Sequence, residues 1–127
     1  TADEVPDPQE ESTFTNSTLD WSELDDTEGE SALLLDWYRT LIRLRRDEQA
    51  LAADDLGTTR VERRGKGSSS VVVVHRGDLR VVVNLSDEPV TEAGEVVAAW
   101  HTVDVREGRD GSGSSVVIPT DSVVLLR

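Results

Sequence analysis

Two neighbouring apolar stretches constrain the fold of this chain more than any other feature. The stretch Val71–His75 begins with four valines in a row, and the stretch Leu79–Leu85 has a leucine or a valine at every second position. Alternation with a period of two is typical of a half-buried strand, whereas a run of β-branched residues is typical of a strand buried on both faces. Because Arg76-Gly77-Asp78 between them supplies turn residues, we predict a β-hairpin whose first strand is central in its sheet.

Short stretches of strand type continue on both sides of this hairpin. The further predicted strands cover residues 58–63, 96–100, 102–106, 115–118 and 122–126. Glycine, proline and aspartate separate them, with a three-glycine loop at residues 107–114 and a turn at Pro119-Thr120-Asp121. Six or seven short strands at regular spacing predict a mainly β fold, a small antiparallel β-sandwich.

A helical pattern precedes the strands. Leu34, Trp37, Leu41 and Leu44 recur at steps of three and four residues, which predicts one amphipathic helix over residues 27–50. Its predicted start is a capping box, in which side chains three positions apart satisfy free backbone N–H groups; the pair here is Thr27 and Glu30.

The apolar side of this predicted helix is wide. Leu33, Leu34 and Leu35 together cover most of its circumference, so we expect the helix to pack on more than one side. Trp37 and Tyr38 could form a platform for stacking a sugar, but at helical spacing we interpret both as core residues.

Charge divides the chain unevenly. Of the formal net charge of -13, residues 1–56 hold 16 acidic and 4 basic side chains, whereas residues 57–127 hold 10 and 9. This balance argues against nucleic acid as a partner, because a phosphate backbone needs a concentrated basic surface. Residues 1–30 carry 11 acids and no base, and the large apolar residues there are few: Val5, Phe14, Leu19, Trp21 and Leu24. We predict an irregular, extended segment whose apolar side chains anchor it on another surface.

These patterns divide the chain into three parts. We predict an acidic extended connection over residues 1–26, the helix over residues 27–50, and the β-sandwich domain over residues 57–127. The chain contains no methionine, which predicts that it is part of a longer protein.

Few residues offer chemistry. There is no cysteine, which excludes thiolate metal sites and cysteine nucleophiles, and no recognised phosphate-binding, dinucleotide-binding or serine-hydrolase motif occurs. His75 and His101 have no candidate partner nearby in sequence, so we assign both structural roles. The acids Asp25, Asp26, Glu28 and Glu30 lack the alternation of a calcium loop and are interpreted as a solvated surface. We therefore predict no catalytic, cofactor-binding or metal-binding residue in this chain, and the sequence does not identify substrate-binding residues.

Two short motifs are interpreted as coincidental. Arg76-Gly77-Asp78 matches the adhesion tripeptide, but Gly and Asp are ordinary turn residues. Asn16 and Asn84 begin glycosylation sequons, but the acidic first residues lack the pattern of a secretion signal. Without such a signal or an apolar run of membrane-spanning length, we expect a cytoplasmic chain with no membrane contact.

Three blocks of the sequence carry a resemblance. The first runs through Val5-Pro6-Asp7-Pro8-Gln9, Thr13-Phe14 and Leu19-Asp20-Trp21, and it resembles the malto-oligosyltrehalose trehalohydrolases of the alpha-amylase superfamily. The second, Trp37-Tyr38-Arg39 with Leu41 to Arg46, is similar to the last helix of that superfamily's catalytic barrel. The third, the valine strands up to Val83-Asn84-Leu85-Ser86 with Pro119 to Val123, is similar to the C-terminal β domain that follows it. One departure lies in the first block, where Thr18 replaces a lysine that the family often has.

The resemblance implies a noncatalytic C-terminal portion of a glycoside hydrolase. The intact enzyme would release trehalose from maltooligosyl trehalose by hydrolysing an α-1,4-glucosidic bond. Its catalytic carboxylates would lie on earlier barrel strands, and the barrel would be the partner of this chain. Two alternatives remain open: a freestanding carbohydrate-binding sandwich, for which Trp100 is the one aromatic residue after Tyr38, and an adhesion module built on Arg76-Gly77-Asp78.

Overall fold

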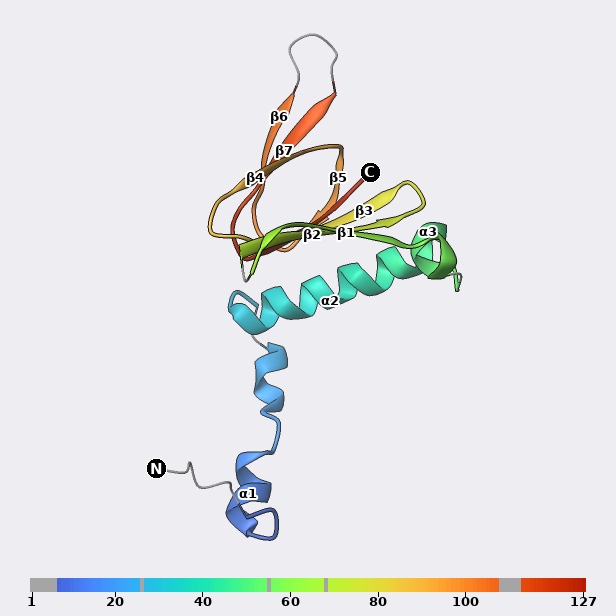
Figure 1. The fold of residues 1–127 in the computed structure, drawn as a ribbon. Helices are drawn as coiled ribbons and strands as arrows, with labels where there is room; N and C mark the ends of the chain where they lie inside the picture. The colour runs from blue at the N-terminus through green and yellow to red at the C-terminus, as the bar shows by residue number, and fades with distance from the viewer. Residues whose placement is uncertain (1–6, 26, 55, 68, 108–112) are drawn as a thin grey trace. The chain divides into compact units, whose positions relative to one another are not determined.

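A computed structural model describes residues 7–25, 27–54, 56–67, 69–107 and 113–127. The chain forms two compact units, Thr1–Asp36 and Trp37–Arg127. Figure 1 shows the helices and strands along the chain. Asp26 and most of the predicted loop at residues 107–114 lie outside the described residues.

The first unit contains short helical turns where we predicted an extended, irregular segment, so that prediction is wrong in part. A short helix α1, Glu11–Asn16, is followed by a 3₁₀ turn η1, Trp21–Asp25. Local hydrogen bonds from short polar side chains hold both: the Thr13 hydroxyl donates to the Asp7 carbonyl (2.7 Å), and the Asp20 carboxylate accepts from the Ser22 backbone N–H (2.9 Å). Such bonds need no apolar periodicity, so the hydrophobic pattern did not reveal these turns.

The predicted amphipathic helix is confirmed, with a different start. Helix α2 covers Glu30–Asp47, and its first backbone bond runs from the Leu33 N–H to the Gly29 carbonyl (3.1 Å). Gly29 therefore occupies the N-cap position, and the predicted capping box at Thr27 is wrong. The helical path breaks at Glu48, then continues in the short helix α3, Gln49–Ala52, and the 3₁₀ turn η2, Leu56–Thr58.

The second unit is an antiparallel β-sandwich, as predicted, with eight strands among the described residues instead of six or seven. One sheet has the order β1-β2-β3-β8-β5, with bounds Arg60–Lys66, Ser69–Arg76, Leu79–Leu85, Ser122–Leu126 and Val96–Ala99. The other has the order β4-β7-β6, with bounds Val90–Ala93, Ser114–Ile118 and Asp104–Glu107. The additional strand is β4, which has one large apolar residue and pairs through Val90 with Ile118.

The predicted hairpin is confirmed residue by residue. Val73 pairs with Val82, Arg76 pairs with Leu79, and β2 lies between β1 and β3 as a central strand. Gly77 has a φ of 60°, a left-handed conformation that glycine adopts without steric cost. The predicted turn before the last strand is also present, with Asp121 at a φ of 50°.

The five-stranded sheet is apolar on both faces. One face joins the three-stranded sheet in a core of fully or nearly fully buried residues: Val71, Val73, Val82, Val116, Ile118, Val124 and Leu126. On the other face, Leu79, Ala98 and Leu125 pack against Trp37 and Leu44 of α2 and against α3. From Trp37 onward the unit thus has three layers, a helix and two sheets (Figure 1).

Candidate functional site

The outward side of α2 has an exposed apolar surface in the second unit. Trp37 and Leu44 pack on the sheet, whereas Tyr38, Leu41 and Ile42 are 57%, 40% and 51% exposed. Positions 38, 41 and 42 lie on one side of a helix because of its 3.6-residue period. We call these three residues the outer stripe of α2. Within the described part of the second unit these three side chains are exposed, so packing of the helix on more than one side stays a prediction.

The two aromatic residues of α2 therefore have different environments. Trp37 contacts Trp100 edge-to-face, with ring centroids 5.6 Å apart, and the prediction that it is a core residue is confirmed. Tyr38 lies in the exposed outer stripe, so the same prediction is wrong for Tyr38. Trp100 is partly buried by this contact, and its other aromatic neighbour is His101 at 5.7 Å.

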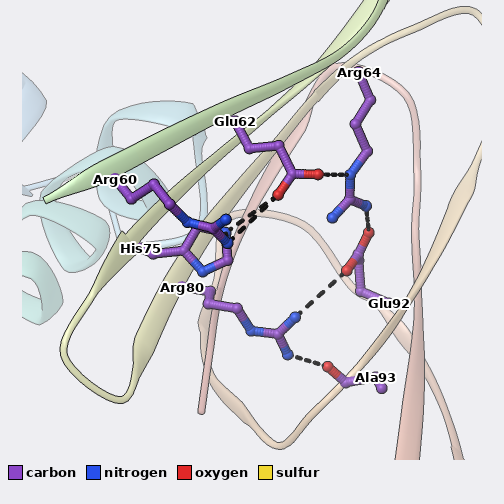
Figure 2. Close-up of polar contacts among 7 residues, drawn as sticks. All are labelled: Arg60, Glu62, Arg64, His75, Arg80, Glu92 and Ala93. Atoms are coloured by element: carbon purple, nitrogen blue, oxygen red, sulfur yellow. Dashed lines mark hydrogen bonds and ion pairs between the residues drawn. The ribbon is translucent and has the colours of Figure 1, made fainter.

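A row of charged side chains crosses the edge of the sandwich (Figure 2). Glu62 and Arg64 lie two positions apart on β1 and therefore point to the same face, where the Arg64 Nε donates to the Glu62 carboxylate (2.7 Å). Arg64 also donates to the carboxylate of Glu92, which β4 brings from the other sheet. The second oxygen of Glu92 lies 3.5 Å from the Arg80 guanidinium on β3.

Glu92 is the buried member of this row. Its side chain is 9% exposed, whereas those of Arg80 and Arg64 are 27% and 46% exposed. Arg80 additionally donates to the Ala93 carbonyl, so the same guanidinium contacts the backbone and the carboxylate of β4. A buried carboxylate is tolerated only with such partners, so we assign this row to joining the two sheets.

His75 lies at the other end of the row. Its Nε2 is 3.1 Å from the Arg60 guanidinium and 3.5 Å from the Glu62 carboxylate. These partners are distant from His75 in sequence because they come from the neighbouring strand, and the signal for them was the alternation of Arg60, Glu62 and Arg64 along that strand. The hydrogen bond from Arg64 is the main reason that the pKa of Glu62 lies below its usual value.

A polar hollow of about 400 Å³ lies beside Arg64 and Glu92. Its remaining lining consists of small and β-branched residues: Gly65, Ser69, Ser70, Val71, Ser86, Val90 and Thr91. It contains no aromatic surface, and both charged side chains are already paired. The hollow therefore lacks the apolar lining typical of a small-molecule site.

Side chains of the adhesion tripeptide and of the Asn84 sequon form hydrogen bonds within the fold. The side chain of Arg76 donates to the Ala53 carbonyl, and the Asp78 carboxylate accepts from Arg127 (3.0 Å), so neither arm of the adhesion tripeptide is free. The Asn84 side chain is fully buried and donates to the Ile118 and Pro119 carbonyls at 3.1 and 2.9 Å. A glycan cannot be attached to that nitrogen in the folded chain.

Over the ranges that the structure describes, no three His, Asp or Glu side chains gather closely enough to hold a metal ion. None of the described helices combines the length and the apolar character that crossing a bilayer requires.

Known relatives match most of the chain. It is 37% identical over 123 residues to the malto-oligosyltrehalose trehalohydrolase of Rhizobium sp. (strain M-11), which is 97% of this chain and 20% of the relative. It is 40% identical over 103 residues to the malto-oligosyltrehalose trehalohydrolase of Mycobacterium tuberculosis (strain H37Rv), which is 80% of this chain and 17% of the relative. The chain thus spans about one fifth of the length of these curated relatives.

The resemblance predicted from the three sequence blocks is confirmed by these matches. A protein family described as "Domain of unknown function (DUF3459)" matches residues 56–125, which are the β-sandwich with η2 before it. That stretch is more than half of the chain, and the chain belongs to the DUF3459 family.

Proposed function

We propose that this chain is the noncatalytic C-terminal portion of a larger glycoside hydrolase of the malto-oligosyltrehalose trehalohydrolase type. The chain matches about one fifth of such relatives, so most of the intact protein lies elsewhere in its sequence. In this proposal the intact enzyme is a cytoplasmic member of the alpha-amylase superfamily that acts in trehalose biosynthesis. It releases trehalose by hydrolysing an α-1,4-glucosidic bond with two carboxylates of its catalytic barrel.

The outer stripe of α2 is the observation that carries this proposal. One side of the helix packs on the sheet through Trp37 and Leu44. Tyr38, Leu41 and Ile42 remain exposed. An apolar surface of this kind on a regular helix is favourable only when another surface covers it. We assign the cover to the catalytic barrel, with residues 1–26 as the connection, 27–50 as its last helix and 57–127 as the following β domain.

The three-layer packing suggests how the chain would serve the barrel. Trp37 and Leu44 seat α2 on a sheet that also has its own core on the opposite face. A helix held in this way presents the outer stripe with little freedom to reorient. The β domain would therefore fix the last barrel helix in place without touching the substrate.

Reconstitution from two pieces tests the proposal. The preceding part of the intact protein and this chain are expressed separately, mixed, and assayed for trehalose release from maltooligosyl trehalose. We expect activity from the mixture and none from the chain alone. Leu41→Glu should abolish association, because it places a charge in the covered stripe.

Arg43→Glu provides the matched control. Arg43 is exposed and, two positions after Leu41, lies on the opposite side of the helix from it, so the new glutamate there should leave association intact. Hydrolysis by the chain alone, or equal association of the Leu41→Glu and Arg43→Glu variants, would contradict the proposal. Circular dichroism of both variants confirms that α2 remains folded.

A further inference from the structure

The first unit contains a hollow that the assignment above does not use. It has a volume of about 440 Å³ and lies between the end of α1 and η1. Its apolar walls are Leu19, Trp21 and Leu24, which are 74%, 72% and 56% exposed. The size lies in the range of small-molecule sites, and the walls include the indole of Trp21.

The rest of the lining is polar. It consists of Asn16, Ser17, Thr18, Asp20 and Glu23. The Asp20 carboxylate is held by Ser22, whose hydroxyl and backbone N–H donate to one oxygen at 2.6 and 2.9 Å. Both hydrogen bonds from Ser22 keep the pKa of Asp20 below its usual value, and the bond from the hydroxyl has the larger effect. A fixed, ionised acceptor thus lies next to an exposed indole.

This combination matches a neutral sugar better than it matches a protein surface. A pyranose ring has an apolar C–H face that can lie on an indole, and hydroxyl groups at its rim that can donate to a carboxylate. An apolar protein surface over the same hollow would bury Asp20 and Glu23 without donors for them, which costs free energy. Phe14, in contrast, is 77% exposed but does not line the hollow.

We propose that Trp21 and Asp20 form a subsite for one glucosyl unit of an α-1,4-linked oligosaccharide, with Trp21 stacking on the ring and Asp20 accepting from its hydroxyl groups. This subsite rests on the proposed function, which supplies the substrate class, and adds a sugar contact from a chain that otherwise has a scaffold role. The subsite binds and positions the glucosyl unit and takes no part in breaking the glucosidic bond.

Tryptophan indole signals test this subsite in the 127-residue chain. The chain has three tryptophans, so a ¹⁵N-labelled sample gives three indole N–H signals. Trp21→Phe identifies the signal of Trp21, and Trp100→Phe identifies that of Trp100. On titration with maltotetraose we expect the Trp21 signal to move. Trp37 and Trp100, which contact each other, should stay in place. Sorbitol, which has hydroxyl groups but no ring, serves as the control ligand and should move none of the three.

Substitutions then test the roles of the two residues. Trp21→Ala should weaken maltotetraose binding about tenfold, since it removes the stacking surface. Asp20→Asn should weaken it as well, whereas Trp21→Phe should retain most of it. Phe14→Ala, the matched control at an equally exposed aromatic, should bind as the unaltered chain does. Backbone amide signals of residues 16–24 report binding in the variants that lack the indole.

The subsite would be overturned by no movement of the Trp21 signal with maltotetraose, by equal movement with sorbitol, or by equal loss of binding in Trp21→Ala and Phe14→Ala. Movement of the Trp100 signal instead would place the sugar on the sandwich and would also contradict the proposal. None of these outcomes affects association with the preceding part of the protein, so failure of the subsite and failure of the scaffold role are distinguishable.

Discussion

The carboxylate of Glu92 on β4 lies 3.5 Å from the guanidinium of Arg80 on β3, and this pair connects the two sheets of the sandwich. Arg64 on β1 contacts the other oxygen of the same carboxylate. The buried Glu92 therefore receives cations from two strands of the opposite sheet.

Removal of the Glu92 charge should destabilise the chain. Glu92→Gln leaves two arginines with a weaker acceptor, so we expect a loss of about 1.5–3 kcal/mol in the free energy of unfolding. The loss is limited to this range because both arginines can regain water. Urea unfolding followed by tryptophan fluorescence measures this loss. Glu95→Gln, at an exposed carboxylate close by on the chain, is the control and should change stability by less than about 0.5 kcal/mol. Equal losses in the two variants would contradict the assigned role.

The stability of the folded chain should decrease at acidic pH in part because Glu62 becomes protonated. Its pKa is lowered in the folded chain, chiefly by the hydrogen bond from Arg64, so its contribution is present above the unfolded pKa and is lost as pH falls through the folded pKa. We expect part of the decrease in melting temperature between about pH 5 and pH 2 to disappear in Glu62→Gln. Thermal unfolding across this range checks it, and parallel curves for both proteins would refute it.

Asn84 should be far more sensitive to substitution than the other sequon asparagine. Asn84→Ala removes a fully buried amide that donates to the Ile118 and Pro119 carbonyls, of which the Pro119 carbonyl still accepts from the Ser122 hydroxyl, and we expect a loss of about 3 kcal/mol. Asn16→Ala, at an exposed position, should cost less than about 0.5 kcal/mol. Chemical unfolding compares the two variants, and a small loss at Asn84 would show that water replaces its hydrogen bonds.

Two glycines where β1 leads into β2, Gly65 near the end of β1 and Gly67 in the turn, should differ in their tolerance of alanine. Both have left-handed φ angles, 99° at Gly65 and 64° at Gly67, so each substitution carries a backbone cost. A Cβ on Gly65 would lie 2.5 Å from the Ser69 carbonyl oxygen, whereas a Cβ on Gly67 meets nothing within 4 Å. We expect Gly67→Ala to cost about 1 kcal/mol and Gly65→Ala clearly more, as measured by melting temperature and unfolding free energy.

Local pattern was enough to predict the hairpin and the presence of α2, but not which side of α2 meets the sheet. The valine run and the alternation from Leu79 to Leu85 each repeat with the period of a strand, so their faces follow from the backbone. Asn84 is buried in that hairpin as a polar residue because three carbonyls surround its amide nitrogen. Those carbonyls belong to Glu88, Ile118 and Pro119, which lie outside the hairpin, and no local sequence rule identifies them as partners of Asn84.

The sequence by itself determined the main helix and seven of the eight strands that the structure describes, and its blocks indicated the family. Tertiary structure alone decided that Val90–Ala93 forms a strand, because pairing with β7 outweighs its weak pattern. It also decided that Glu92 meets Arg64 and Arg80, and that Trp37 is covered while Tyr38 on the same helix is exposed. The physical reason is that periodicity records which residues share a face, whereas burial depends on which surfaces that face meets.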